Sequence, residues 1–166
     1  MRRIAVFVDG SNFFYMQKDC LKWWIDPKKL LRWCGERGSV VDATYYASVD
    51  PENEAQGSYS KALCHIGYRV ESKTIKTFTA ANGSVKHKAN LDIEIVLDMF
   101  NTINNYDEAI LVSGDADFGR ALQILRARGK SFLVLSTKGF VASEIRAIAG
   151  MHYRDFQEIK EFVEKD

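Results

Sequence analysis

The chain has 166 residues, of which 46% are hydrophobic and 27% are charged, and its formal net charge is +1. This composition is typical of a globular protein with enough apolar mass for a core, and the length predicts a single domain over residues 1–166. The near balance of 23 Lys and Arg against 22 Asp and Glu excludes a nucleic-acid binder that works through net charge alone. No apolar run approaches the roughly 20 residues that a membrane span needs, so we expect no membrane association.

The cysteines and the N-terminal segment indicate in which cellular compartment the protein is expected. Cys20, Cys34 and Cys64 are odd in number and none lies at metal-ligand spacing from another, so we expect free thiols that pack as small core residues. The apolar run at 4–8 is too short for a signal-peptide core and ends in the acid Asp9, which favours a strand over a targeting segment. Both observations predict a cytoplasmic protein.

Runs of β-branched and aromatic residues alternate along the chain with segments of helical periodicity. The predicted strands are, in order, 4–8, 40–49, 68–78, 109–112 and 131–135, with a short edge strand or a loop at 85–90. The predicted helices lie at about 13–21, 27–33, 51–66, 91–103, 118–128, 141–149 and 155–163. This alternation predicts an α/β, three-layer fold, with a mostly parallel sheet of about five strands and helices on both faces.

Two helical segments carry further expectations. Residues 91–103, LDIEIVLDMFNTI, are apolar most of the way round, which predicts a helix buried on more than one side. Trp23 and Trp24 are adjacent and on a helix cannot both face one core. One of them could lie at a dimer interface or form a stacking platform, but we favour partial burial as the simpler explanation.

Acidic residues gather at the predicted carboxyl edge of the sheet. Within residues 106–118, YDEAILVSGDADF, the apolar run at 109–112 predicts a buried strand, and Asp115 and Asp117 follow it after a Ser-Gly turn. Asp9 ends the first strand, and Asp92 lies in the first turn of a helix. Open parallel sheets bind ligands beyond this edge, where adjacent acids repel one another unless a cation joins them. Carboxylates without His or Cys suit Mg²⁺ or Mn²⁺, and such a site supports phosphodiester hydrolysis.

Each acid also has a structural interpretation. Asp115 could serve simply as the cap of the helix that follows it. The helix dipole favours an acid at the position of Asp92 whether or not a metal binds there. Four acids at one edge are less easily explained by capping. Asp98 lies six residues after Asp92, on a different helix face, so we expect Asp98 and Glu94 to be structural or to support the ligands.

Three other metal-site patterns come close to this sequence. The segment 9–13, DGSNF, lacks the last Ser of the DxSxS metal site and the second Asp of the DxD motif of haloacid-dehalogenase phosphatases. A Toprim domain has a DxD like that of Asp115 and Asp117 but needs a Glu where Asp9 stands. These remain alternatives. Neither a GxGxxG motif nor a P-loop is present, so we expect no nucleotide cofactor.

Three blocks, FVDGSNF at 7–13, KANLDIEIVLDM at 88–99 and SGDADF at 113–118, resemble the signature blocks of the NYN domain, in the LabA-like branch of the PIN-like nuclease superfamily. The resemblance implies a PIN-like fold, a Mg²⁺ or Mn²⁺ site and ribonuclease activity. By position it implies that the metal-binding and catalytic acids are Asp9, Asp92, Asp115 and Asp117. It also implies that Asn12 and Ser113 are polar partners of the metal or phosphate and that Lys88 contacts a phosphate.

Cationic residues add candidates for substrate binding. Arg120, one turn into the helix after the acid pair, could contact a phosphate or pair with a neighbouring acid. Residues 69–88 hold five Lys or Arg and one acid, which fits either a path for an RNA backbone or a solvated hairpin.

These observations lead to two functional hypotheses. The first is a metal-dependent ribonuclease, with RNA as its partner and with a homodimer or a second protein as further candidates. The second is a regulatory module that binds RNA or a protein, keeps the acids and turns over little or nothing.

Overall fold

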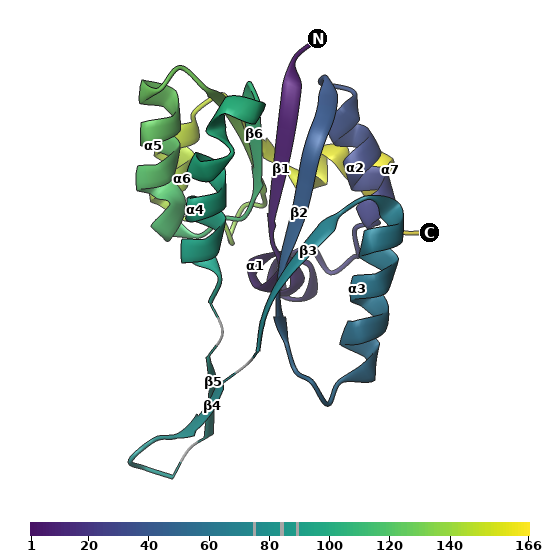
Figure 1. The fold of residues 1–166 in the computed structure, drawn as a ribbon, viewed down its shortest axis with the longest axis vertical. Coiled ribbons are helices and arrows are strands. Elements are labelled where there is room, and N and C mark those ends of the chain that lie inside the picture. The colour runs from purple at the N-terminus through teal and green to yellow at the C-terminus, as the bar shows by residue number, and fades with distance from the viewer. Residues whose placement is uncertain (75, 84, 89) are drawn as a thin grey trace.

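The computed structural model describes residues 1–74, 76–83, 85–88 and 90–166, and its centre is a six-stranded sheet in the order β3-β2-β1-β6-β7-β8. All neighbouring strands in this sheet are parallel. The strands are β1 (Arg3–Asp9), β2 (Ser39–Val49), β3 (Arg69–Thr74), β6 (Glu108–Val112), β7 (Ser131–Ser136) and β8 (Tyr153–Asp155). From β1 the chain builds outward to β3 and then crosses to β6 on the other side of β1, so the strand order reverses between β1 and β6 (Figure 1).

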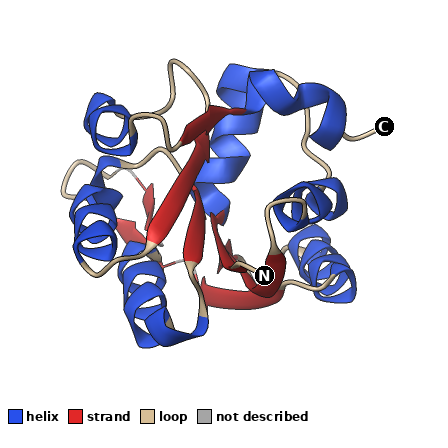
Figure 2. Ribbon diagram, turned by 90° about the horizontal axis from the view of Figure 1, so that it is seen from above, coloured by secondary structure: helices blue, strands red, loops and turns tan. Residues whose placement is uncertain are grey.

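Helices cover both faces of the sheet, so the molecule has three layers (Figure 2). Residues of α1 (Gly10–Tyr15), the π-helix η1 (Met16–Leu21), α2 (Pro27–Gly35), α3 (Glu54–Ile66), the 3-10 helix η4 (Phe156–Ile159) and α7 (Lys160–Val163) share one core cluster. Residues of α4 (Asp92–Asn101), the 3-10 helices η2 (Ile103–Asn105) and η3 (Ala116–Phe118), α5 (Gly119–Ala127) and α6 (Ser143–Ala149) share the other. The predicted three-layer α/β fold is confirmed.

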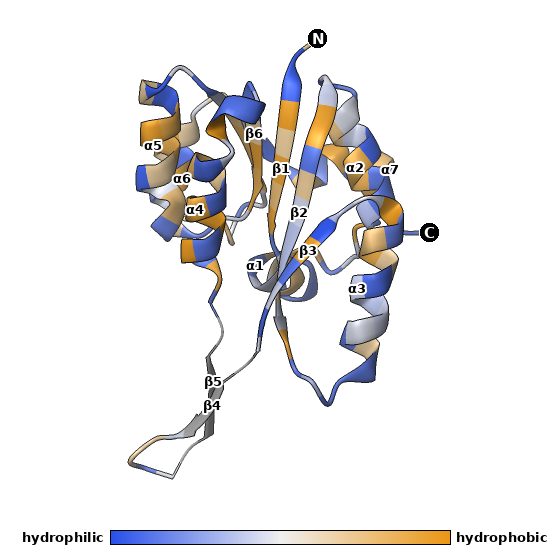
Figure 3. Ribbon diagram, viewed as in Figure 1, coloured by the Kyte–Doolittle hydropathy of each residue, from blue (hydrophilic) through white to orange (hydrophobic). Residues whose placement is uncertain are grey.

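Successive side chains of β1 belong to different core clusters, one on each face of the sheet. Val6 and Val8 pack with one cluster, and Ala5 and Phe7 pack with the other. Because successive strand side chains point to opposite faces, a strand covered on both faces needs a continuous apolar run. Figure 3 shows this as hydrophobic colour along β1 and β6, with hydrophilic residues on the outer helices.

Two strand predictions differ from the structure. The predicted count of five central strands missed β8, which has only three residues and pairs with β7 alone. Three residues are too few to show the pattern of a strand next to the helix predicted at 155–163. That predicted helix corresponds to η4 and α7. The predicted strand at 68–78 contains β3 and β4 (Lys76–Thr79), and β4 forms an antiparallel hairpin with β5 (Val85–Lys88). This hairpin projects from the body of the molecule (Figure 1).

The prediction that residues 91–103 form a helix buried on more than one side is wrong. Ile95 and Met99 of α4 are fully buried, but Ile93 is 72% exposed and Leu97 is 62% exposed. Ile93 and Leu97 lie one turn apart on the solvent face, and apolar composition alone cannot tell which face meets the sheet.

Cysteine and tryptophan burial follow the expectations in part. The three cysteines are free, and Cys34 is buried as expected, but Cys64 is exposed on α3, whose inner face is filled by Leu63. Trp23 is 9% exposed and Trp24 is 48% exposed, so the two neighbours differ in burial as expected, although both lie between η1 and α2 and not on a helix. Among the described residues, no helix combines the length and the apolar character that a bilayer crossing requires.

The start of α1 requires a residue without a side chain. A Cβ atom added at Gly10 would lie 2.4 Å from the Tyr46 carbonyl oxygen and 2.7 Å from Cε1 of Tyr45. We expect Gly10→Ala to lower the free energy of unfolding by about 1–3 kcal/mol, because β2 and the turn into α1 must separate. Gly57→Ala is the matched control in α3, where an added Cβ meets nothing within 4 Å. It should raise stability by about 0.5–1 kcal/mol.

Urea denaturation of both variants against wild type checks this prediction. A Gly10→Ala protein as stable as wild type would show that the contact between α1 and β2 is loose.

Candidate metal centre

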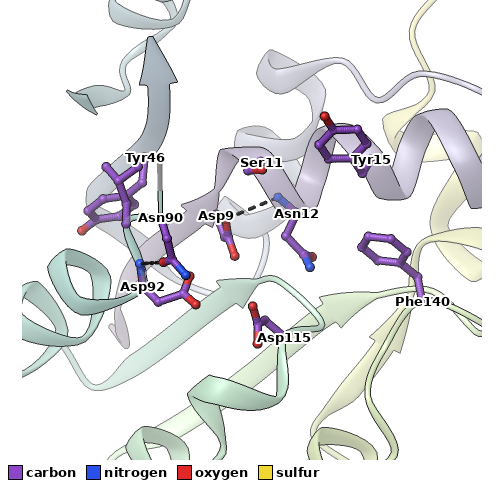
Figure 4. Close-up of a pocket in the computed structure, with 10 residues that line it drawn as sticks. Asp9, Ser11, Asn12, Tyr15, Tyr46, Asn90, Asp92, Asp115 and Phe140 are labelled. Atoms are coloured by element: carbon purple, nitrogen blue, oxygen red, sulfur yellow. Dashed lines mark hydrogen bonds between the residues drawn. The ribbon is translucent and has the colours of Figure 1, made fainter. Parts of the chain in front are cut away.

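Three carboxylates meet at the carboxyl edge of the sheet. Asp9 is the last residue of β1, and Val8 pairs with Val112 at the end of β6, so the chain after Val112 leaves the sheet beside Asp9. Asp92 is the first residue of α4, which packs against β1. One oxygen from each of Asp9, Asp92 and Asp115 lies within 4.8 Å of the others. Figure 4 shows the three side chains pointing toward one another.

Hydrogen bonds hold Asp9 in place. Its Oδ2 accepts from the Ser113 hydroxyl at 3.0 Å, and its Oδ1 accepts from the Asn12 backbone N–H at 3.4 Å. The Ser113 Oγ in turn accepts from the Asp115 N–H at 3.2 Å, and the Asn12 Oδ1 accepts from the Gly114 N–H at 3.0 Å. Ser113 and Asn12 therefore connect the chain leaving β1 to the chain leaving β6.

The capping interpretation holds for Asp9 and Asp115, and three of the four predicted acids converge. Asp9 caps α1, and Asp115 caps η3 because its Oδ1 accepts from the Asp117 N–H at 2.9 Å. Asp92 does not cap α4, but its own N–H donates to the Asn90 Oδ1 at 2.7 Å. Capping therefore orients the carboxylates of Asp9 and Asp115 in the cluster.

Asp92 carries the electrostatic cost of this arrangement. Its Oδ2 is buried and has no hydrogen-bond partner among the described residues. Burial, together with the negative charges of Asp9 and Asp115, raises the pKa of Asp92 to about 7. Burial also raises the pKa of Asp9, although its bonds to Ser113 and Asn12 oppose that effect.

The donor set fits a hard divalent cation. Carboxylate oxygens without His or Cys are the ligands that Mg²⁺ and Mn²⁺ prefer, and the described acid group contains only Asp. A cation would neutralise the repulsion that raises the pKa of Asp92 and would give its buried Oδ2 a partner.

A pocket opens beside the acids, and several residues that line it were not predicted from the sequence. Its lining residues are Asp9, Ser11, Asn12, Tyr15, Tyr46, Asn90, Leu91, Asp92, Asp115 and Phe140. Ser11 stood within the DGSNF block, and Tyr46 lies toward the carboxyl end of β2. Phe140 comes from the loop after β7, and nothing in its local sequence indicates this position.

The remaining predicted site residues lie around this centre. Asp117 is exposed and stands outside the group of three acids, although its charge contributes to the raised pKa of Asp92. Arg120 is exposed in the first turn of α5 and is not among the described residues that line the pocket. The side chain of Lys88 lies outside the described residues. The proposed roles of these three residues stay predictions.

Asp98 and Glu94 make other contacts, as expected for structural or supporting residues. Asp98 accepts a hydrogen bond from the Tyr46 hydroxyl at 2.8 Å, which orients a ring that lines the pocket. Glu94 pairs with Lys73 at 2.7 Å and so joins α4 to β3, the strand that precedes the hairpin.

The raised pKa of Asp92 predicts a pH-dependent stability of the metal-free protein. Between about pH 4 and pH 7 the folded chain retains a proton on Asp92 that the unfolded chain has lost, so stability falls as the pH rises. In EDTA at about pH 8 we expect Asp92→Asn to be more stable than wild type, with the difference shrinking toward about pH 4.

Urea denaturation at several pH values measures this difference. Glu36→Gln, an exposed acid at the end of α2, is the control and should follow wild type. An Asp92→Asn protein without a stability gain at high pH would contradict the proposed repulsion.

Comparison with known proteins identifies the family and the fold of the chain. The model of the NYN domain family matches residues 3–156. The Synechococcus elongatus protein described as "Low amplitude and bright protein LabA" is 41% identical over 168 aligned residues, which cover 98% of this chain and 88% of that protein. A crystal structure of a Vibrio parahaemolyticus protein of unknown function shares the fold, with a TM-score of 0.80 at 23% identity over 98% of this chain and 96% of that one. The chain therefore belongs to the NYN domain family.

Proposed function

We propose that the protein is a metal-dependent ribonuclease that hydrolyses RNA phosphodiester bonds, with Mg²⁺ or Mn²⁺ as its cofactor. The observation that carries this proposal is the convergence of Asp9, Asp92 and Asp115 within 4.8 Å at the point where the strand order reverses. Membership of the NYN family, within the PIN-like nuclease superfamily, supports the same chemistry.

The acids have different parts in this proposal. Asp9 is the ligand held most firmly, because Ser113 and the start of α1 fix both of its oxygens. Asp92 provides the buried oxygen that lacks a partner, and it must lose its proton before it can bind a cation. Asp117 adds negative charge at the same edge and completes the acid set that we expect to act on the metal. A bound cation would hold a phosphodiester oxygen and lower the pKa of an attacking water.

RNA binding must overcome the negative charge of this edge. Without a cation, an anionic phosphate would be repelled by the acids, so a metal-free binding role does not account for their convergence. Because the Asn12 Oδ1 is engaged with Gly114, its NH₂ group is the part that can donate to a phosphate oxygen. We expect Arg120 and Lys88 to contact phosphates of the RNA.

Loss of a ligand is the direct test of the proposed activity. Partners in the outer shell of a metal site typically contribute 10–100-fold to activity, so Asp9→Asn and Asp115→Asn should reduce cleavage by at least about a hundredfold. Ser113→Ala should give an intermediate loss of about 10–100-fold, because it leaves Asp9 as a ligand but releases its orientation. The measurement is Mn²⁺-dependent cleavage of end-labelled RNA, single-stranded and duplex.

Glu36→Gln is the matched control and should cleave like wild type. Retained metal-dependent cleavage in both ligand variants would refute the proposed site. RNA binding that EDTA does not change, with no product formed, would instead favour the regulatory module.

Proton competition at Asp92 predicts how the metal affinity varies with pH. Below about pH 7 each bound cation must displace the proton of Asp92, so Mn²⁺ affinity should rise about tenfold per pH unit and level off above that value. In Asp92→Asn the affinity should be lower and this steep dependence should disappear.

Calorimetric titration of Mn²⁺ in buffers of different ionisation enthalpy measures both the affinity and the number of protons released. A wild-type affinity that stays constant between about pH 5.5 and pH 8 would contradict the assignment of Asp92 as a ligand.

A further inference from the structure

Three aromatic side chains form an exposed cluster near the acids. Phe14 is 45% exposed, Tyr15 is 49% exposed and Trp24 is 48% exposed. The ring centroids of Phe14 and Tyr15 lie 5.3 Å apart, and those of Phe14 and Trp24 lie 5.7 Å apart. We call these three residues the aromatic cluster. Their rings contact one another in series while about half of each remains open to solvent.

The backbone beneath the aromatic cluster is firmly held. The Gln17 side chain donates to the Phe13 carbonyl at 3.0 Å and accepts from the Ile25 N–H at 2.7 Å. The Trp24 carbonyl accepts from the Lys165 N–H at 2.8 Å. These bonds fix the chain on both sides of Trp24, so its exposure does not come from a loose segment.

The inner face of the segment that carries Phe14 and Tyr15 packs in the hydrophobic core. Phe13 is 2% exposed and Met16 is 1% exposed, whereas Phe14 and Tyr15 are the aromatic residues that α1 turns outward. The helix then widens into the π-helix η1, a rare element that is frequent at functional sites.

The aromatic cluster is continuous with the pocket. Tyr15 lines the pocket together with Asp9 and Asp115, and Phe140 lines it from the loop after β7. In Figure 4, Tyr15 and Phe140 lie on the side of Asn12 away from Asp92. The pocket therefore has an anionic part that suits a metal and an aromatic part that leads out to Phe14 and Trp24.

The loop that carries Phe140 is also fixed. The Thr137 hydroxyl donates to Asp155 at 2.8 Å, and the Phe140 N–H donates to the Thr137 carbonyl at 3.1 Å. At the other end of this loop the Ala142 N–H donates to the Gly114 carbonyl at 2.9 Å. These hydrogen bonds therefore hold the loop of Phe140 in place relative to the acids.

We propose that the aromatic cluster, with Phe140, is a base-stacking subsite that binds unpaired bases of RNA next to the phosphate held at the acids. The proposal rests on the ribonuclease function proposed above, because it takes RNA as the ligand of the same pocket. Aromatic rings stack on any base, and stacking typically strengthens binding about five- to a hundredfold per base. The base faces of a duplex are already stacked, so this subsite selects single strands.

Charge around the aromatic cluster also favours RNA. Lys18 and Lys22 are exposed in the stretch between Tyr15 and Trp24, which has one exposed acid, Asp19. Exposed rings in a segment that also exposes two lysines, next to the proposed phosphate-binding centre, match the combination that single-stranded nucleic acids require.

The test measures binding separately from cleavage. In an Asp115→Asn background, anisotropy of a labelled single-stranded RNA is compared with that of the same sequence as a duplex. Adding Phe14→Ala or Tyr15→Ala should weaken single-strand binding about five- to a hundredfold, whereas Tyr15→Phe should retain it. Met151→Ala, at an 87% exposed apolar residue between α6 and β8, is the control and should bind like the parent.

Tryptophan fluorescence gives a second readout. Stacking on Trp24 should quench the emission of the parent protein on addition of single-stranded RNA, and Trp24→Phe should remove that part of the quenching. A purely structural role for the ring would not produce this signal.

Several results would overturn the subsite. The first is failure of the parent to bind single-stranded RNA, and the second is equal binding by the parent and by the Phe14→Ala and Tyr15→Ala variants. The third is an equal loss of affinity for single strand and duplex, and the fourth is a change in self-association with no change in RNA binding. Mn²⁺-dependent cleavage by the Asp115-intact protein separates the two proposals. RNA binding that depends on the rings, without cleavage, would refute the proposed ribonuclease activity and support the subsite. Cleavage by a protein whose RNA binding does not depend on the rings would support the ribonuclease activity and refute the subsite.

Discussion

The parallel pairing of β1 with β6 is the constraint on which the site depends. Since Val8 lies opposite Val112, the two chains leave the sheet side by side and Asp9 meets Ser113 and Asp115. The chain reaches this pairing only after it has built β2 and β3 on the other side of β1. The reversal of strand order therefore creates the opening, and α4 brings Asp92 to it as the chain returns toward β6.

Charge repulsion is the cost of this construction. Three carboxylates share a small volume, one buried oxygen of Asp92 has no partner in the described structure, and the pKa of Asp92 rises to about 7. Hydrogen bonds from Ser113 and from the start of α1 keep Asp9 in position despite that repulsion. An arrangement that is unfavourable by itself and favourable with a divalent cation is typical of a metal site rather than of a structural network.

The two parts of the pocket would recognise different parts of the proposed substrate. In the proposed function the acids would act, through a cation, on the phosphate, which is the same in every nucleotide. The aromatic cluster would act on the faces of the bases, which a single strand exposes and a duplex covers. Hydrogen bonds connect the chain that follows β1 to the chain that follows β6, and the loop after β7 to that same segment, as a site that must position a reacting phosphate requires.

Local sequence determined the buried strands, the order of the elements and the acids at the strand ends, because apolar runs and their turn residues are short-range signals. It also located the NYN blocks that contain Asp9, Asp92 and Asp115. Tertiary structure alone decided that Asp117 stands outside the group of three acids and that Ile93 and Leu97 of α4 face solvent. It alone brought Phe140 from the loop after β7 to the pocket that Tyr15 lines. The physical reason is that periodicity records which face of an element is apolar, whereas packing and loop paths decide what that face meets.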